Sequence, residues 1–204
     1  AVYDDTAADK LCVYDRAGRG WSEPAGTPQD GGQIATDLHT LLQRGDVPGP
    51  YVLAGHSFGG LYVLTFAARY PDEVAGLVLV DSTAPGSTAE PRTTSADDES
   101  ADDIMDRVAA LVSASARLGL ARLYGQLEQG SLPQRSRDEV LASSATASHV
   151  RSTIDEYVQA SDSTDQAASL GDFGDKPLVV LTAGSGHDAA WSAAQDDLAT
   201  LSTN

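Results

Sequence analysis

The chain has 204 residues, in which 13 lysines and arginines stand against 30 aspartates and glutamates, so its formal net charge is -17 at pH 7. This balance disfavours nucleic acid as a partner, because phosphate backbones bind basic surfaces, and it disfavours anionic membranes for the same reason. A hydrophobic fraction of 41% over this length predicts one globular domain with a real core and room for an inserted subdomain.

The cysteine content narrows the class of protein further. Cys12 is the only cysteine, which excludes an internal disulfide and a cysteine-based zinc module. We expect neither a metal nor a cofactor, and a reducing compartment such as the cytoplasm. No apolar run approaches the roughly 20 residues that cross a bilayer, and the N-terminal AVYDDTAADK lacks the basic and apolar stretches of a secretion signal.

The first part of the chain alternates between two kinds of element. Short apolar runs predict buried strands, helically spaced apolar residues predict helices, and glycine or proline marks their ends. The predicted elements are a strand at Leu11 to Tyr14, a helix through Ile34 and Leu42 that ends at Gly45, a strand at Tyr51 to Ala54, a helix at Leu61 to Tyr70 stopped by Pro71, and a strand at Leu77 to Val80. Strands alternating with helices at these intervals favour a parallel sheet.

The composition changes after Asp81. Residues Ser87 to Asp103 are polar and acidic, which predicts an exposed connection, and Ile104 to Val158 has the sparse helical spacing of a small helical insert. The earlier pattern then resumes, with a buried strand at Leu178 to Leu181 and a helix at Trp191 to Leu201.

One motif carries chemistry. Gly55-His56-Ser57-Phe58-Gly59 is a G-x-S-x-G sequence between a predicted strand and a predicted helix, the context in which this motif forms a sharp turn that exposes a nucleophilic serine. We expect Gly55 and Gly59 to be small because strand and helix approach closely there. The backbone N–H of Phe58 is the expected oxyanion donor at the helix N-terminus.

Three ordered motifs make the chain resemble the α/β-hydrolase superfamily, specifically its esterase-like and peroxidase-like members with a helical cap. They are the G-x-S-x-G turn, the upstream loop Asp15-Arg-Ala-Gly18-Arg-Gly20-Trp21-Ser22, and the downstream segment Tyr70 to Asp81. The resemblance implies an α/β class and a partial α/β-hydrolase fold, a mostly parallel sheet flanked by helices with a helical cap insertion. Residues 1–84 and 176–204 would form the core, and 85–175 the cap with its acidic linker.

The resemblance also implies a catalytic acid. In the family it follows the strand after the cap, which points to Asp188; the alternative is Asp81, at the end of the preceding strand. Asp188 has a competing interpretation as the N-cap of the helix that contains Trp191, since aspartate is a preferred cap residue. We expect Asp15 to close its loop by accepting hydrogen bonds.

The family's catalytic histidine, which takes the proton of the serine, would lie beyond Asn204, and its first oxyanion segment would lie before Ala1. We therefore expect the chain to be an internal piece of a longer hydrolase. Of the four histidines, His56 should pack beside the nucleophile, His39 should face solvent, and His149 should cap a helix. His187 is the candidate for a substitute base.

Two functions remain open at this stage. The first is a serine hydrolase that acts on a small-molecule substrate. Carboxylic esters are the default, and cofactor-free peroxidase, C–C bond hydrolase and aminopeptidase activities remain open. The second is a non-catalytic, small-molecule-binding relative that lacks the histidine. The sequence does not determine the oligomeric state.

Overall fold

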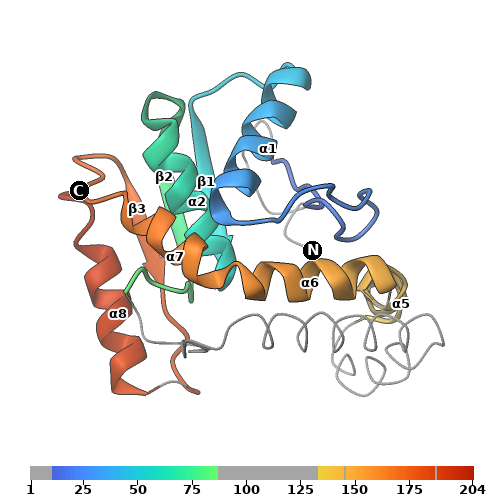
Figure 1. Ribbon diagram of the computed structural model, residues 1–204. Helices are drawn as coiled ribbons and strands as arrows, with labels where there is room; N and C mark the ends of the chain where they lie inside the picture. Colours follow the sequence, from blue (N-terminus) through green and yellow to red (C-terminus); the bar gives the residue numbers. More distant parts are fainter. Residues whose placement is uncertain (1–10, 87–132, 145, 187) are drawn as a thin grey trace, which may run out of the picture. The chain divides into compact units, whose positions relative to one another are not determined.

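The computed structural model describes residues 11–86, 133–144, 146–186 and 188–204 (Figure 1). These residues belong to two compact units. One contains 11–26 and 133–154, and the other contains 27–86 and 155–204. Among the described residues, no helix is long and apolar enough to cross a membrane.

The larger unit is built on a three-stranded parallel sheet of order β1-β2-β3. The strands are β1 (Tyr51–His56), β2 (Val74–Val80) and β3 (Leu178–Leu181). His56 pairs with Val80, and Val80 pairs with Leu181, so the three strands end in register. The residues that follow, among them Ser57 and Asp81, therefore meet at the carboxyl edge of the sheet, where open α/β sheets place their ligands.

The helices begin and end where local chemistry favours it. Asp30 caps α1 (Gly31–Arg44) by accepting a hydrogen bond from the N–H of Gln33. Gly45 is the C-cap residue, and the residue after it, Asp46, has a positive φ of 48°. α2 (Phe58–Arg69) ends before Pro71, which starts the short 3₁₀ helix η2 (Pro71–Glu73). The remaining helices are α5 (Gln134–Ser144), α6 (Ala147–Val158), α7 (Ala160–Ala168) and α8 (Ala189–Ala199).

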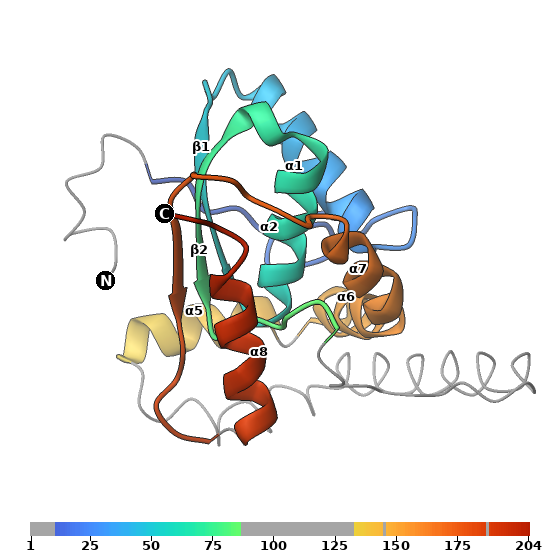
Figure 2. The same cartoon turned by 90° about the vertical axis from the view of Figure 1, so that its left-hand side faces the viewer.

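The core lies on one face of the sheet. Helix α2 packs on β1 and β2, α1 and α7 pack on α2, and α8 packs on β3 (Figure 2). Because it is enclosed in this way, α2 is buried without interruption from Gly60 to Ala67. Three side chains of the opposite sheet face are exposed, Val52 at 67%, Val179 at 47% and Leu181 at 52%.

Helix α7 belongs to the unit that holds the sheet, although its residues fall inside the expected 85–175 insert. The hydroxyl of Ser163 accepts a hydrogen bond from the N–H of Gly31 at 2.9 Å, and the side-chain oxygen of Gln166 accepts one from the N–H of Gly32 at 2.6 Å. The two side chains satisfy N–H groups of α1 that have no acceptor within their own helix.

One predicted strand is wrong. Leu11 to Tyr14 has no strand structure, and Leu11 and Val13 are 43% and 71% exposed. A four-residue apolar run indicates a strand only if a neighbouring strand is there to pair with it, and β1, β2 and β3 are the only members of the sheet among the described residues. The other predicted strands and the helices at 34–42, 61–70 and 191–201 are confirmed within a few residues. Most of the predicted insert at Ile104 to Val158 lies outside the described residues, and α5 and α6 are its described helices.

Candidate active site

The turn 55–59, which we call the elbow, holds Ser57 in a conformation that non-glycine residues avoid. Ser57 has φ 53° and ψ −126°, a region that costs of the order of 1–3 kcal/mol and persists only where the surroundings impose it. The residue stands at the N-cap position of α2, yet its side chain makes no capping hydrogen bond. Within the described part of the chain, its Oγ has no hydrogen-bond partner. The strained turn therefore presents an unengaged hydroxyl.

Hydrogen bonds to the end of β2 and to the residues just after it hold the elbow in place. The N–H of Ser57 donates to the carbonyl of Val80 at 3.3 Å, and the carbonyl of Ser57 accepts from the N–H of Thr83 at 3.1 Å. Ser82, which is fully buried, donates its hydroxyl to the carbonyl of Gly55 at 2.9 Å. These bonds are the surroundings that impose the strained backbone of Ser57.

The glycines in and next to the elbow differ in how closely other atoms approach them. A Cβ built on Gly55 would lie 2.4 Å from the carbonyl oxygen of Gly59, and one on Gly60 would lie 2.4 Å from the Cβ of Ser82. A Cβ on Gly59 would meet no described atom within 4 Å. Strand and helix do approach closely, as expected, but the contact requires glycine at positions 55 and 60. The expectation that Gly59 is small for the same reason is wrong as far as the described atoms show.

Phe58 is the first residue of α2. The N–H groups of a helix's first turn have no acceptor within the helix, so the N–H of Phe58 is available beside Ser57 to stabilise negative charge. The role of this N–H as the oxyanion donor stays a prediction.

The two candidate acids have different surroundings. Asp188 is exposed and accepts a hydrogen bond from the N–H of Trp191 at 2.8 Å, so it is the N-cap of α8. Asp81 follows β2 directly and has a positive φ of 44°. Its Oδ1 accepts from the indole Nε1–H of Trp191 at 3.0 Å and from the N–H of Ala183 at 3.3 Å. Asp81 is thus a carboxylate held by side chain and backbone at the same sheet edge as Ser57.

His39 and His56, the described histidines of the larger unit, form no hydrogen bond with the side chain of Ser57. His187 lies outside the described residues. His56 is an exposed residue at the end of β1. The Nε2 of His149 lies 3.2 Å from Nη1 of Arg19. The backbone N–H of His149 donates to the hydroxyl of Thr146, so Thr146 is the capping residue and the predicted capping role of His149 is wrong.

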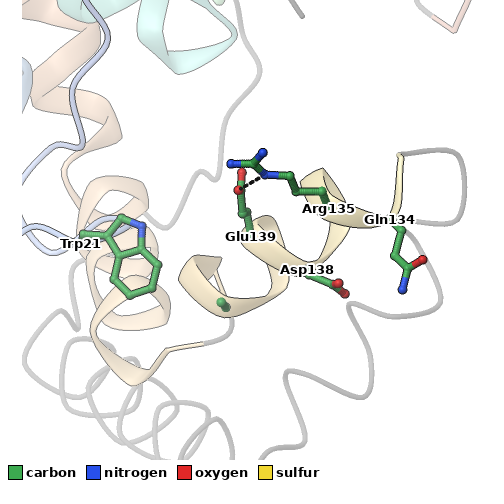
Figure 3. Close-up of a pocket in the computed structure, with 6 residues that line it drawn as sticks. Trp21, Gln134, Arg135, Asp138 and Glu139 are labelled. Carbon is green, nitrogen blue, oxygen red and sulfur yellow. Dashed lines mark hydrogen bonds and ion pairs between the residues drawn. The ribbon is translucent and has the colours of Figure 1, made fainter.

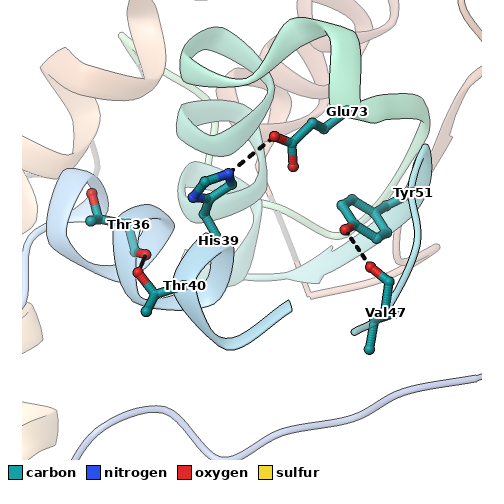
Figure 4. Close-up of polar contacts among 6 residues, drawn as sticks. All are labelled: Thr36, His39, Thr40, Val47, Tyr51 and Glu73. Carbon is teal, nitrogen blue, oxygen red and sulfur yellow. Dashed lines mark hydrogen bonds and ion pairs between the residues drawn. The ribbon is translucent and has the colours of Figure 1, made fainter. Parts of the chain in front are cut away.

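His39 is not the solvent-facing residue that the sequence predicted. Its ring stacks on Tyr70 with centroids 4.1 Å apart. Its Nε2 lies 3.0 Å from Oε1 of Glu73 (Figure 4). Nearby, the hydroxyl of Tyr51 donates to the carbonyl of Val47 at 2.8 Å. Burial raises the pKa of Tyr51 above its usual value, and the negative charge of Glu73 raises it further. This cluster stabilises α1 against the end of α2 and has no contact with the elbow.

Asp15 closes its loop as predicted. One carboxylate oxygen of Asp15 accepts from the N–H of Trp21 at 3.1 Å, and the backbone carbonyl of Asp15 accepts from the hydroxyl of Ser22 at 2.6 Å.

Trp21 lines an open hollow of about 610 Å³ together with residues of α5 (Figure 3). Arg135 and Glu139 form an exposed ion pair at 3.1 Å on its rim. The hollow and the elbow belong to different units.

Two side chains at the sheet edge were not predicted from the sequence. Trp191 is expected there only as a residue of a helix, yet its indole donates to Asp81. Ser82 is fully buried behind the elbow. Neither contact has a local signal, because the partners lie 110 and 27 residues apart. No cluster of three or more potential metal ligands occurs among the residues that the structure describes.

A family model described as the alpha/beta hydrolase fold matches residues 8–203. The chain therefore belongs to the α/β-hydrolase fold family.

Solved structures share this fold. The wild-type Cfl2 protein of Burkholderia cenocepacia is 22% identical, with a TM-score of 0.68 over 93% of this chain and 68% of that chain. A thermophilic esterase from Thermogutta terrifontis is 22% identical, with a TM-score of 0.62 over 93% of this chain and 67% of that one. The epoxide hydrolase CorEH is 21% identical, with a TM-score of 0.59 over 81% and 62% of the two chains.

Curated relatives match shorter stretches. An uncharacterised protein of Schizosaccharomyces pombe is 47% identical over 73 residues, which are 36% of this chain and 14% of that protein. The lipase LipV of Mycobacterium tuberculosis is 54% identical over 41 residues, which are 20% of this chain and 15% of the lipase. The matches thus span about a seventh of the length of these two relatives.

Proposed function

We propose that the protein is a serine hydrolase that acts on carboxylic esters, with Ser57 as its nucleophile. The observation that carries the proposal is the strained backbone of Ser57 together with its unengaged hydroxyl within the described residues. The esterase and the lipase among the similar proteins support the same class of substrate.

In this mechanism the Oγ of Ser57 attacks the ester carbonyl while a histidine takes its proton. The carbonyl oxygen becomes an oxyanion, which accepts a hydrogen bond from the N–H of Phe58. As the tetrahedral intermediate collapses, the protonated histidine gives its proton to the leaving alkoxide, which departs as the alcohol and leaves an acyl-serine. Water then hydrolyses this ester, and the histidine takes a proton from the water and returns it to the oxygen of Ser57. The base is a histidine outside the described residues, His187 or one further along a longer chain.

We assign the acid that orients this histidine to Asp81 in preference to Asp188. The carboxylate of Asp81 is already fixed by Trp191 and Ala183, whereas Asp188 is occupied as a helix cap. Asp81 also follows Val80, whose carbonyl accepts the N–H of Ser57.

The nucleophile is tested on the full-length protein with a fluorophosphonate probe. We expect labelling of the wild-type protein and none of Ser57→Ala. Labelling that survives the substitution would refute the role of Ser57.

The acid is tested by two isosteric substitutions. Asp81→Asn should lower kcat roughly 10³-fold to 10⁴-fold, because an amide cannot hold the histidine in the tautomer that accepts the serine proton. Asp188→Asn is the matched control and should change kcat less than about threefold, since asparagine caps a helix as well as aspartate. The opposite pattern would transfer the role to Asp188.

The second candidate is a non-catalytic protein that binds a small molecule. It is favoured by one observation, that neither His39 nor His56, the described histidines of the larger unit, is hydrogen-bonded to the side chain of Ser57. Turnover of p-nitrophenyl acetate by the full-length protein, abolished in Ser57→Ala, would exclude it.

A further inference from the structure

Three consecutive residues at the end of α6, all within the larger unit, each contact another residue of that unit. Oδ2 of Asp155 accepts a hydrogen bond from the N–H of Gln29 at 2.9 Å. Oε2 of Glu156 accepts from the hydroxyl of Tyr62 at 3.3 Å. The ring of Tyr157 packs edge-on against Phe58, with centroids 5.1 Å apart and an interplanar angle of 68°.

Two of these contacts fall on the start of α2. Phe58 and Tyr62 are four residues apart, so they lie one above the other on the same face of the helix. Tyr62 and Glu156 are both only 5% exposed, which makes their contact part of the interior. The last turn of α6 therefore supports the first two turns of the helix that begins immediately after Ser57.

Phe58 needs such support more than residues further along α2. Its backbone N–H has no intrahelical acceptor, and helix ends open locally at a low free-energy cost. The ring of Phe58 is partly buried against the core, and Tyr157 covers it from α6. An edge-to-face pair of this kind contributes about 0.5–1.5 kcal/mol beyond the area that it buries.

We propose that Tyr157 is a positioning residue that holds Phe58 so that its N–H points at the developing oxyanion. The inference rests on the proposed serine-hydrolase function and deepens it. Tyr157 is 55% exposed, so the contact with Phe58, rather than burial in the core, is what its ring contributes.

The test compares Tyr157→Ala with Tyr157→Phe in the full-length protein, with p-nitrophenyl acetate as substrate. Losing an oxyanion donor outright costs roughly 10²-fold to 10³-fold in kcat. Because the substitution loosens the donor without removing it, Tyr157→Ala should lower kcat about tenfold and change KM less than about threefold. Tyr157→Phe keeps the edge-on ring and should restore kcat to within about twofold of the wild type.

A transition-state analogue separates positioning from general damage. The inhibition constant of a trifluoromethyl ketone, which forms a tetrahedral adduct with serine, should rise in Tyr157→Ala by about the factor by which kcat/KM falls. Partial unfolding would lower the number of active sites and leave that constant unchanged. Val158→Ala is the matched control, because it truncates the next side chain of α6, which is 51% exposed, and leaves the Phe58 ring pair in place; its inhibition constant should stay within about twofold.

The outcomes distinguish the two proposals. If the wild-type protein is active and the inhibition constant is unchanged in Tyr157→Ala, this inference alone is overturned. The same holds if Tyr157→Phe is as impaired as Tyr157→Ala. A wild-type protein without Ser57-dependent turnover would overturn the proposed function, and the role of Tyr157 with it.

Discussion

The elbow predicts opposite effects of alanine at its two motif glycines. A Cβ at position 55 would lie 2.4 Å from the carbonyl oxygen of Gly59, 2.6 Å from its carbonyl carbon and 2.8 Å from the nitrogen of Gly60. The first contact is roughly 1 Å short of the about 3.5 Å at which non-bonded atoms attract. All three partners are backbone atoms, so relief requires α2 to move away from β1.

Overpacking of a core costs typically about 1–3 kcal/mol, and a clash with backbone belongs at the upper end. We expect Gly55→Ala to lower the free energy of unfolding by about 3 kcal/mol. For a domain of this size, that corresponds to a fall in Tm of about 6–12 °C. Urea unfolding of the full-length protein, followed by tryptophan fluorescence, measures the change.

Gly59→Ala is the matched control. A Cβ there meets no described atom within 4 Å, and alanine favours the helix that Gly59 begins to form. Its free energy of unfolding should be unchanged or up to about 1 kcal/mol higher. Equal destabilisation by both substitutions, or a loss below about 0.5 kcal/mol for Gly55→Ala, would refute the reasoning.

Three further predictions concern single side chains. Ser57→Gly should be about 1 kcal/mol more stable than Ser57→Ala in urea unfolding, because glycine adopts a φ of 53° without strain; equal stabilities would mean that the turn is unstrained. Tyr51 holds its proton more tightly in the folded state, so its contribution to stability is full below pH about 10 and is lost as the pH rises through the raised pKa. Titration of labelled tyrosine by NMR should show a lower pKa for Tyr51 in Glu73→Gln, and an unchanged pKa would exclude the carboxylate as a cause. His39→Ala should lower the free energy of unfolding by about 1–2 kcal/mol through loss of the Tyr70 stack and the Glu73 contact, and a loss under about 0.3 kcal/mol would contradict that.

Features with a local chemical cause could be predicted from the sequence. The end of α2 before Pro71 has such a cause, because a proline restricts its own backbone and lacks the N–H that a helix needs. Ser57 could be predicted as the strained residue because its neighbours in the motif define a strand, a turn and a helix within a few positions.

Features that depend on distant partners could not be predicted from the sequence. The apolar run at Leu11 to Tyr14 has the composition of a strand, but a strand also needs hydrogen bonds from a neighbour that local sequence does not specify. The side chains of Ser163 and Gln166 satisfy the first turn of α1 from more than 130 residues away. The resemblance pointed to Asp188, with Asp81 as the alternative. The proposal of Asp81 instead rests on the hydrogen bond from the indole of Trp191, a contact that local sequence does not specify.

The hydrogen bonds that tie the elbow to β2 also determine how the serine responds to fluctuations of the fold. The N–H of Ser57 and the N–H of Thr83 are both engaged between the elbow and the strand end, at 3.3 Å and 3.1 Å. Their amide protons should therefore exchange with solvent only when the sheet opens, at the slow rate of β2 rather than at that of a surface loop. Any substitution that weakens β2, however far from the carboxyl edge, then increases the fraction of time in which Ser57 is free to relax out of its strained conformation.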